Sequence, residues 1–234
     1  MLIEFEHRES DSPFVETVWR SRSREGGKFL SMAEGNVELV VSRLPGHVSV
    51  ILRGPVGQGS FVECPADGEW LAIRFRLGTY LPQIPTMLLI DHQSLELPVS
   101  KDRFWLGCDS WEIPSFDNAE DLVCMLANAG LIARNHATDA AIEGDVNWMS
   151  RRSVQRHFLR VTAMTFSNYQ RIQRARHAAA LLTDGNSILN TVFDAGYFDQ
   201  SHLTRSVKQL VGMTPAALVR ERPQLSFSYK QKSR

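Results

Sequence analysis

One stretch, Ser187 to Pro215, restricts the fold of this chain more than any other part of the sequence. It reads SILNTVFDAGYFDQSHLTRSVKQLVGMTP. Serine favours a helix N-terminus because its hydroxyl accepts a free N–H group of the first turn. Ser187 therefore predicts a helix from Ile188 to about Ala195. Gly196 then supplies the permissive backbone that a turn between closely packed helices needs.

A second helix follows this turn. Asp199 is placed to cap it, and we expect it to run from Gln200 to about Val211, where Gly212 ends it. One face of this helix is apolar: Leu203, Val207, Leu210 and Val211. The other face carries side chains that donate hydrogen bonds: Gln200, Ser201, His202, Arg205 and Lys208. Such a face is typical of a helix that lies in the major groove of DNA.

A similar arrangement precedes it. A short helix from Ala137 to Ile142 ends near Gly144, and Ser150 then caps a helix from Arg151 to about Val161. The sequence predicts the following outward and inward residues for that helix. Outward are Arg152, Gln155, Arg156 and Arg160, and inward are Val154, Phe158 and Leu159. Further helices are expected from Phe166 to about Leu182 and from Pro215 to about Glu221.

These residues resemble the AraC/XylS family of transcription regulators, which carries two helix-turn-helix units. The matching motifs are Gly196 to Arg205, then Gly212 to Pro215, and upstream Met149 to Phe158. The resemblance extends back to about Thr138 and covers some 80 residues.

The sequence also departs from the family pattern. Glu143 and Gly144 stand where the family shows an apolar residue and alanine, Ala163 replaces the usual glycine, and Gln173 replaces a common arginine. We therefore expect the second unit to keep the more regular geometry.

The resemblance implies double-stranded promoter or operator DNA as a partner. Arginine can bond guanine through two acceptors, and glutamine can pair with adenine in the same manner. The predicted DNA-binding residues come from both units: Arg152, Gln155, Arg156, Gln200, Ser201, His202 and Arg205. In the turn, Tyr197 and Phe198 are expected to pack inside, and Asp199 to act as a cap.

The first hundred residues alternate between apolar and polar in the manner of half-buried strands. The predicted strands are Leu2–Glu6, Phe14–Trp19, Val37–Val41, His47–Leu52, Ser60–Glu63 and Trp70–Arg76. Gly/Pro turns between them favour an antiparallel barrel or sandwich. The order of elements resembles the cupin-like β-barrel that precedes the DNA-binding part in many AraC/XylS regulators.

The sequence after this barrel is less regular. From Leu77 to Pro114 we expect irregular structure with one or two short elements. A helix from Asn118 to Asn128, capped by Asp117 and ended by Gly130, follows. The resemblance makes it a bridge between domains or part of a dimer interface; it can equally lie on the barrel.

Charge is divided unevenly along the chain. Residues 1–135 hold 12 Lys/Arg and 19 Asp/Glu, a net charge of −7, whereas residues 136–234 hold 14 and 7, a net charge of +7. Such asymmetry is typical of a basic nucleic-acid-binding domain joined to an acidic partner domain.

An enzyme is the less favoured alternative. Cupin metal centres need clustered ligands, but His7, His47 and His92 are isolated, and Cys64, Cys108 and Cys124 lack CxxC spacing. Glu38 and Glu63 could face a lumen, although surface exposure is expected. No cofactor is predicted. The start MLIEFEHRE and the lack of a ~20-residue apolar run predict a cytoplasmic protein without a membrane partner.

The sequence thus predicts a two-domain α+β protein. Its segments are a β-barrel (1–116), a bridging helix (117–135), an AraC-type double helix-turn-helix domain (136–222) and a basic flexible tail (223–234). The predicted function is sequence-specific regulation of transcription, with a barrel that senses a small molecule or mediates homodimerisation. The alternatives are a barrel that serves only assembly and a cupin-type enzyme fused to a DNA-binding domain. An activator would also contact RNA polymerase.

Overall fold

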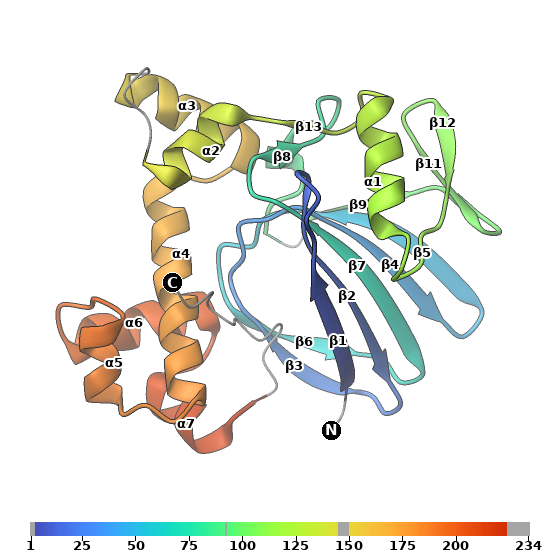
Figure 1. Cartoon of the computed structure of the whole chain (residues 1–234). Coiled ribbons are helices and arrows are strands. Elements are labelled where there is room, and N and C mark those ends of the chain that lie inside the picture. The colour runs from blue at the N-terminus through green and yellow to red at the C-terminus, as the bar shows by residue number, and fades with distance from the viewer. Residues whose placement is uncertain (1–2, 92, 145–149, 224–234) are drawn as a thin grey trace. The chain divides into compact units, whose positions relative to one another are not determined.

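The computed structural model describes residues 3–91, 93–144 and 150–223 (Figure 1). The strands are β1 (Ile3–Glu9), β2 (Val15–Ser23), β3 (Gly27–Ser31), β4 (Glu38–Leu44), β5 (His47–Arg53), β6 (Ser60–Cys64), β7 (Gly68–Phe75), β8 (Thr79–Tyr80), β9 (Ser94–Leu97), β10 (Val99–Ser100), β11 (Arg103–Leu106), β12 (Asp109–Glu112) and β13 (Ala133–Arg134). The helices are α1 (Ala119–Asn128), α2 (His136–Glu143), α3 (Arg151–Thr162), α4 (Phe166–Thr183), α5 (Ile188–Asp194), α6 (Gln200–Val211) and α7 (Pro215–Glu221), with a 3-10 turn η1 at Thr86–Leu88.

The main sheet has six strands in the order β1-β2-β7-β4-β5-β9, and all its pairings are antiparallel. Among the described residues, the pairing leaves β1 and β9 as its two edges. Smaller sheets are formed by β10-β11-β12, by β13-β8 and by β3-β6. The α+β organisation predicted from the sequence, strands first and helices after, is confirmed.

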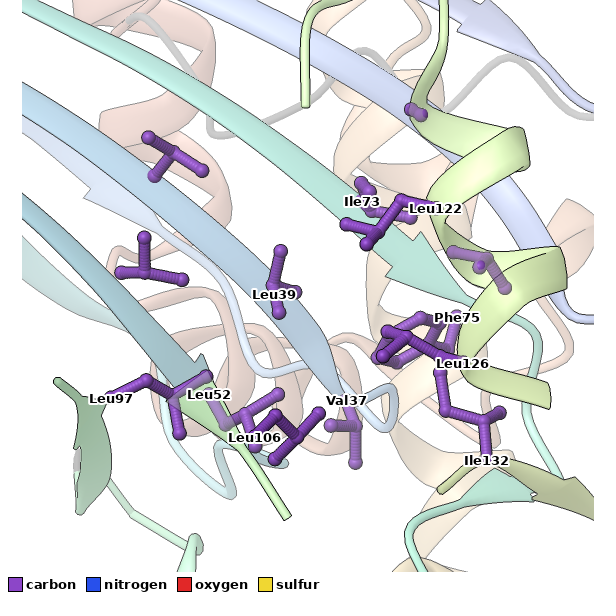
Figure 2. Close-up of a cluster of buried hydrophobic side chains, with 14 of the residues drawn as sticks. Val37, Leu39, Leu52, Ile73, Phe75, Leu97, Leu106, Leu122, Leu126 and Ile132 are labelled. Carbon is purple, nitrogen blue, oxygen red and sulfur yellow. The ribbon is translucent and has the colours of Figure 1, made fainter. Parts of the chain in front are cut away.

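One hydrophobic core lies between the main sheet and α1 (Figure 2). Leu39, Ile73 and Phe75 on the strands are fully buried; from α1, Leu122 lies beside Ile73 and Leu126 beside Phe75. Alternation along the strands produces this face, because successive side chains point to opposite sides of a sheet. Of the placements that the sequence left open for this helix, the structure shows packing on the sheet, and a role as a bridge or in a dimer interface stays a prediction.

Several local predictions need correction. The segment from Leu77 to Pro114 holds β8 to β12 and η1, more than the one or two elements expected, because its short hairpins lack a long alternating run. Strand β3 was not predicted. Helix α1 begins after Asn118 and has no side-chain cap bond from that residue, so Asp117 is not its cap.

Contacts divide the chain into two compact units. The first, here called unit 1, comprises residues 1–27, 35–55 and 65–166, and unit 2 comprises residues 28–34, 56–64 and 167–234. Unit 1 thus holds the main sheet, α1, α2 and α3. Unit 2 holds β6, α5 to α7 and, apart from the first residue of each, β3 and α4. The domain boundaries given above remain a prediction, and the predicted tail lies outside the described residues from 224 onward.

In unit 2 the chain around β3 and β6 binds the C-terminal end of α6. The amide of Ala33 donates to the carbonyl of Leu210 (2.7 Å), and the amide of Gly59 donates to that of Gln209 (3.0 Å). The last carbonyls of a helix have no partner inside it, so these bonds satisfy two of them. Buried Arg176 of α4 also pairs with Glu34 at 2.7 Å.

The departure at Ala163 has a physical consequence. This residue ends α3 with φ +55°, in the left-handed region, and its amide donates to the carbonyl of Leu159 at 2.9 Å. Glycine adopts that conformation without a Cβ penalty, which is why it is common at such helix ends. Alanine keeps the cap geometry at the cost of strain.

Candidate nucleic-acid interface

The first helix-turn-helix unit consists of α2 and α3 in unit 1. Asn135 caps α2 by accepting from the amide of Thr138 (3.1 Å), and Gly144 ends it with φ +80°. Ser150 caps α3, since its Oγ accepts from the amide of Ser153 at 3.2 Å. Residues 145–149 of the connection, including Met149 of the matching motif, lie outside the described residues.

Helix α3 is fixed by its apolar side and leaves its polar side in solvent. Phe158 is fully buried and contacts the ring of Phe166 edge-on at 5.3 Å. Within unit 1, the hydroxyl of Thr86 donates to the carbonyl of Val161 at 2.8 Å, which anchors the C-terminal end of the helix. The inward placement predicted for Leu159 is wrong, because 44% of this residue is exposed.

The second unit consists of α5 and α6. Ser187 caps α5 by accepting from the amide of Asn190 (3.1 Å), and Asp199 caps α6 by accepting from that of His202 (2.6 Å). Leu203 and Val207 are fully buried, and Gly212 ends α6 with φ +96°. Both caps and the apolar stripe are as predicted from the sequence.

A network of polar and aromatic contacts holds the turn between α5 and α6. The amide of Tyr197 donates to the carbonyl of Val192 at 2.8 Å, and its hydroxyl lies 3.1 Å from that of Ser206. The Tyr197 ring meets His202 edge-on at 5.1 Å and lies 5.8 Å below the Arg174 guanidinium. Burial raises the pKa of the Tyr197 hydroxyl, against the opposing hydrogen bond to Ser206.

The next residue does not follow the prediction of packing. Phe198 is 91% exposed, whereas Tyr197 is 6% exposed. Of these two consecutive aromatic residues, only Tyr197 takes the interior position, where its hydroxyl lies beside that of Ser206. The doublet itself is the sequence signal that could have indicated an exposed ring.

Six of the seven predicted DNA-binding residues are exposed, and His202 is half-buried against Tyr197. The structure brings them together in two groups, each on one helix. Arg152, Gln155 and Arg156 lie on α3 in unit 1, and Gln200, Ser201, His202 and Arg205 lie on α6 in unit 2. Whether they contact DNA remains a prediction.

Two basic residues on α4 lie close to the second group. Arg174 stands over Tyr197, and Arg171 donates to the side chain of Gln209 at 3.1 Å. Both side chains are exposed, and arginine neutralises phosphates. Their spacing of three residues on a predicted helix is the sequence signal that places both arginines on one face.

Unit 1 also contains a cavity of about 630 Å³. Its lining includes strand residues of β1, β2, β4 and β7 together with the loop before α1. The lining mixes apolar side chains with charged ones, which include the pairs Arg20–Glu6 (2.6 Å) and Arg22–Glu69 (3.4 Å). The guanidinium of Arg20 also lies 4.6 Å from the centre of the Phe116 ring.

The residues considered for a metal centre do not come together in the described ranges. Residues 3–91, 93–144 and 150–223 contain no group of three or more His, Cys, Asp or Glu suited to a metal ion. His92 lies outside these ranges. The expected exposure of Glu38 is wrong: Glu38 is buried and ion-paired with Arg74 (2.8 Å) and Arg53, whereas Glu63 is exposed. No helix of the described part is long and apolar enough to span a membrane.

Two capped helix pairs, each presenting a polar second helix, define a helix-turn-helix protein. Residues 147–221 match the family model of a helix-turn-helix domain. A relative is the HTH-type transcriptional regulator RipA of Corynebacterium glutamicum, 33% identical over 92 residues, which are 38% of this chain and 28% of RipA. The chain therefore spans little more than a quarter of the relative it matches. These matches confirm that the chain carries the helix-turn-helix domain predicted from its sequence.

Solved structures of ToxT from Vibrio cholerae are also similar. An apo ToxT variant aligns over 91% of this chain and 99% of its own, with 10% identity and a TM-score of 0.40. A form bound to an unsaturated fatty acid aligns over 93% and 94%, with 11% identity and a TM-score of 0.35. Both scores lie below 0.5, so the assignment rests on the sequence matches.

Proposed function

We propose that this chain is a sequence-specific DNA-binding regulator of transcription. The observation that supports it is the pair of N-capped helices, α3 and α6, each exposing arginine and glutamine on a single face. Arginine and glutamine can make two-point hydrogen bonds to guanine and adenine in the major groove. Among the described residues, the side chains of Arg152, Gln155, Arg156 and Arg205 make no ion pair or hydrogen bond within the protein, so they are available to DNA.

The two units would divide the recognition of one operator. Each recognition helix would enter a major groove, and successive grooves on one side of B-DNA lie roughly 34 Å apart. Affinity independent of sequence would come from basic residues such as Arg160, Arg171 and Arg174, since each neutralised phosphate releases counterions. One chain would then contact two half-sites.

The test begins with in vitro selection of bound sequences from random double-stranded DNA. Gln155→Ala combined with Arg156→Ala should remove sequence preference at the first half-site, since each two-point contact contributes roughly 1–3 kcal/mol of discrimination. Arg160→Ala is the matched control on the same helix: it should weaken all sequences equally and reduce the salt dependence. Full specificity in the double variant would refute the assignment of α3.

For the N-terminal half we propose sensing of a small molecule or homodimerisation. The cavity in unit 1 supports the sensor, because its volume falls in the usual range for ligand pockets of roughly 300–1,000 Å³. Its mixture of carboxylates and guanidinium groups suits a small polar ligand that carries charge. Thermal-shift screening of such compounds, together with sedimentation of the free protein, distinguishes a sensor from a module that serves only assembly.

The remaining parts of the proposal concern the cellular setting. We place the protein in the cytoplasm, where its DNA partner is, and we assign it contact with RNA polymerase if it is an activator. The relative named above is a transcription regulator, which agrees with a non-enzymatic role. Metal analysis of the purified protein tests the cupin-enzyme alternative, which a stoichiometric metal would revive.

A further inference from the structure

The most exposed large hydrophobic residue recorded in the described part of the chain stands next to a recognition helix. Phe198 is 91% exposed, and the next in rank is Phe193 at 73%. Single exposed apolar residues are common on protein surfaces, so exposure alone indicates nothing. What distinguishes Phe198 is its place, one residue before Asp199, the cap of α6.

The direction of this ring is fixed by its two neighbours. On one side, Tyr197 is held inside by its bonds to Val192 and Ser206. On the other, the Asp199 carboxylate accepts from the amide of His202, and its backbone is extended, with φ −155°. Between these two held residues Phe198 is 91% exposed, so its ring is directed away from the interior. The outward ring therefore lies in a turn whose two neighbouring residues are both held by hydrogen bonds.

The N-terminal residues of a recognition helix are those that approach base edges. Exposed Gln200, Ser201 and Arg205 surround this end of α6 with hydrogen-bond donors. A phenyl ring there has no donor or acceptor to offer, but the thymine 5-methyl group is the apolar feature of the major groove, and phenylalanine can contact it. Excess positive charge on residues 136–234 favours DNA over another protein as the occupant of this surface.

We infer that Phe198 is a specificity-determining residue that contacts a thymine methyl group at the second half-site. The inference rests on the proposed function, since it requires that α6 enter the major groove. It adds an apolar contact to a helix whose other exposed side chains make polar contacts.

The experiment replaces thymine by uracil, which lacks only the methyl group. An operator from the in vitro selection is synthesised with uracil at each thymine of the second half-site in turn, and binding is measured for the full chain. One position should lose about four-fold in affinity, the value for one buried methyl group. Phe198→Ala should show the same loss with thymine and no further loss with uracil, and Phe198→Leu should retain part of the dependence.

Phe193→Ala is the matched control, because it removes another exposed ring of the same unit without touching the end of α6. It should leave the thymine preference unchanged. The inference is overturned if uracil has equal effects on the wild type and Phe198→Ala, or if Phe198→Ala changes only self-association in sedimentation. If the wild type selects no sequence at all, the proposed function itself fails, and the two failures are therefore distinguishable.

Discussion

Replacement of Glu38 by glutamine tests the electrostatics of the main sheet. Glu38 is 2% exposed and lies opposite both Arg53 and Arg74 in the strand register. Burial alone raises the pKa of a carboxyl group, but here the charges and hydrogen bonds of Arg53 and Arg74 outweigh burial and lower it from 4.5 to about 2. At ~1.36 kcal/mol per pKa unit, this shift corresponds to about 3 kcal/mol of folding stability.

The sign of the effect follows from the lowered pKa. The contribution of the ionised Glu38 is fully present above the unfolded pKa of 4.5 and is lost as the pH falls toward about 2. Glu38→Gln mimics the protonated form, so it should be less stable than the wild type by about 3 kcal/mol at pH 7. The difference should shrink steadily below about pH 4.5 as the wild type loses the same interaction.

Urea unfolding followed by tryptophan fluorescence measures this difference. The four tryptophans among the described residues, Trp19, Trp70, Trp105 and Trp111, belong to unit 1, so the signal reports the unit that contains Glu38. Glu69→Gln is the matched control, since this glutamate of the same sheet pairs with Arg22 but has 52% of its side chain exposed, and it should cost less than ~1 kcal/mol. A loss below about 1 kcal/mol for Glu38→Gln at pH 7, or a loss independent of pH down to about 3, would refute the reasoning.

Three further predictions concern unit 2. Arg205→Ala should relax base preference at the second half-site by roughly 1–3 kcal/mol and leave the first unchanged in a selection assay; equal effects on both half-sites would contradict its assignment. Asp199→Ala should destabilise unit 2 by ~1 kcal/mol in chemical unfolding. Asp199→Asn should keep the stability of the wild type, because asparagine caps a helix as well as aspartate does. In Gly59→Ala the new Cβ would lie 2.1 Å from the carbonyl carbon of Val211. The clash should lower the free energy of opening at the end of α6 by roughly 1–3 kcal/mol, and hydrogen exchange of the amides there should become faster. Gly46→Ala in unit 1 meets no atom within 4 Å and is strained only by its own φ of +75°, so it is the control for destabilisation away from α6. Equal exchange at the end of α6 in both variants would argue against the contact.

The helical half of the fold was largely predictable because its signals are local. Four residues of the N-cap type indicate helix N-termini in the sequence: Ser150, Ser187, Asp199 and Thr214. In the structure each of these side chains accepts a hydrogen bond from an amide of the first turn. The bounds of α6 were predicted without error for the same reason: a cap precedes it and Gly212 ends it.

What could not be predicted depends on contacts between distant residues. Glu38 looked like a surface residue because a strand pattern does not show which arginines lie across the sheet. Ala33 and Gly59 form hydrogen bonds to α6, but no sequence pattern in either segment indicates that it pairs with this helix. Phe198 shows the same limit within the candidate site, since its exposure follows from the packing of Tyr197.

The docking of β3 and β6 onto α6 also governs the order in which this protein can be completed during synthesis. Arg176 lies 143 residues after Ala33, to whose carbonyl it donates a hydrogen bond. The contacts of β3 and β6 with α6 can therefore form only after most of the chain has been synthesised. Contacts of such long sequence separation slow folding, because the intervening loop must close first. A fragment that begins at residue 136 would lack Glu34 and leave the buried guanidinium of Arg176 without this carboxylate, which identifies the full chain as the form to express.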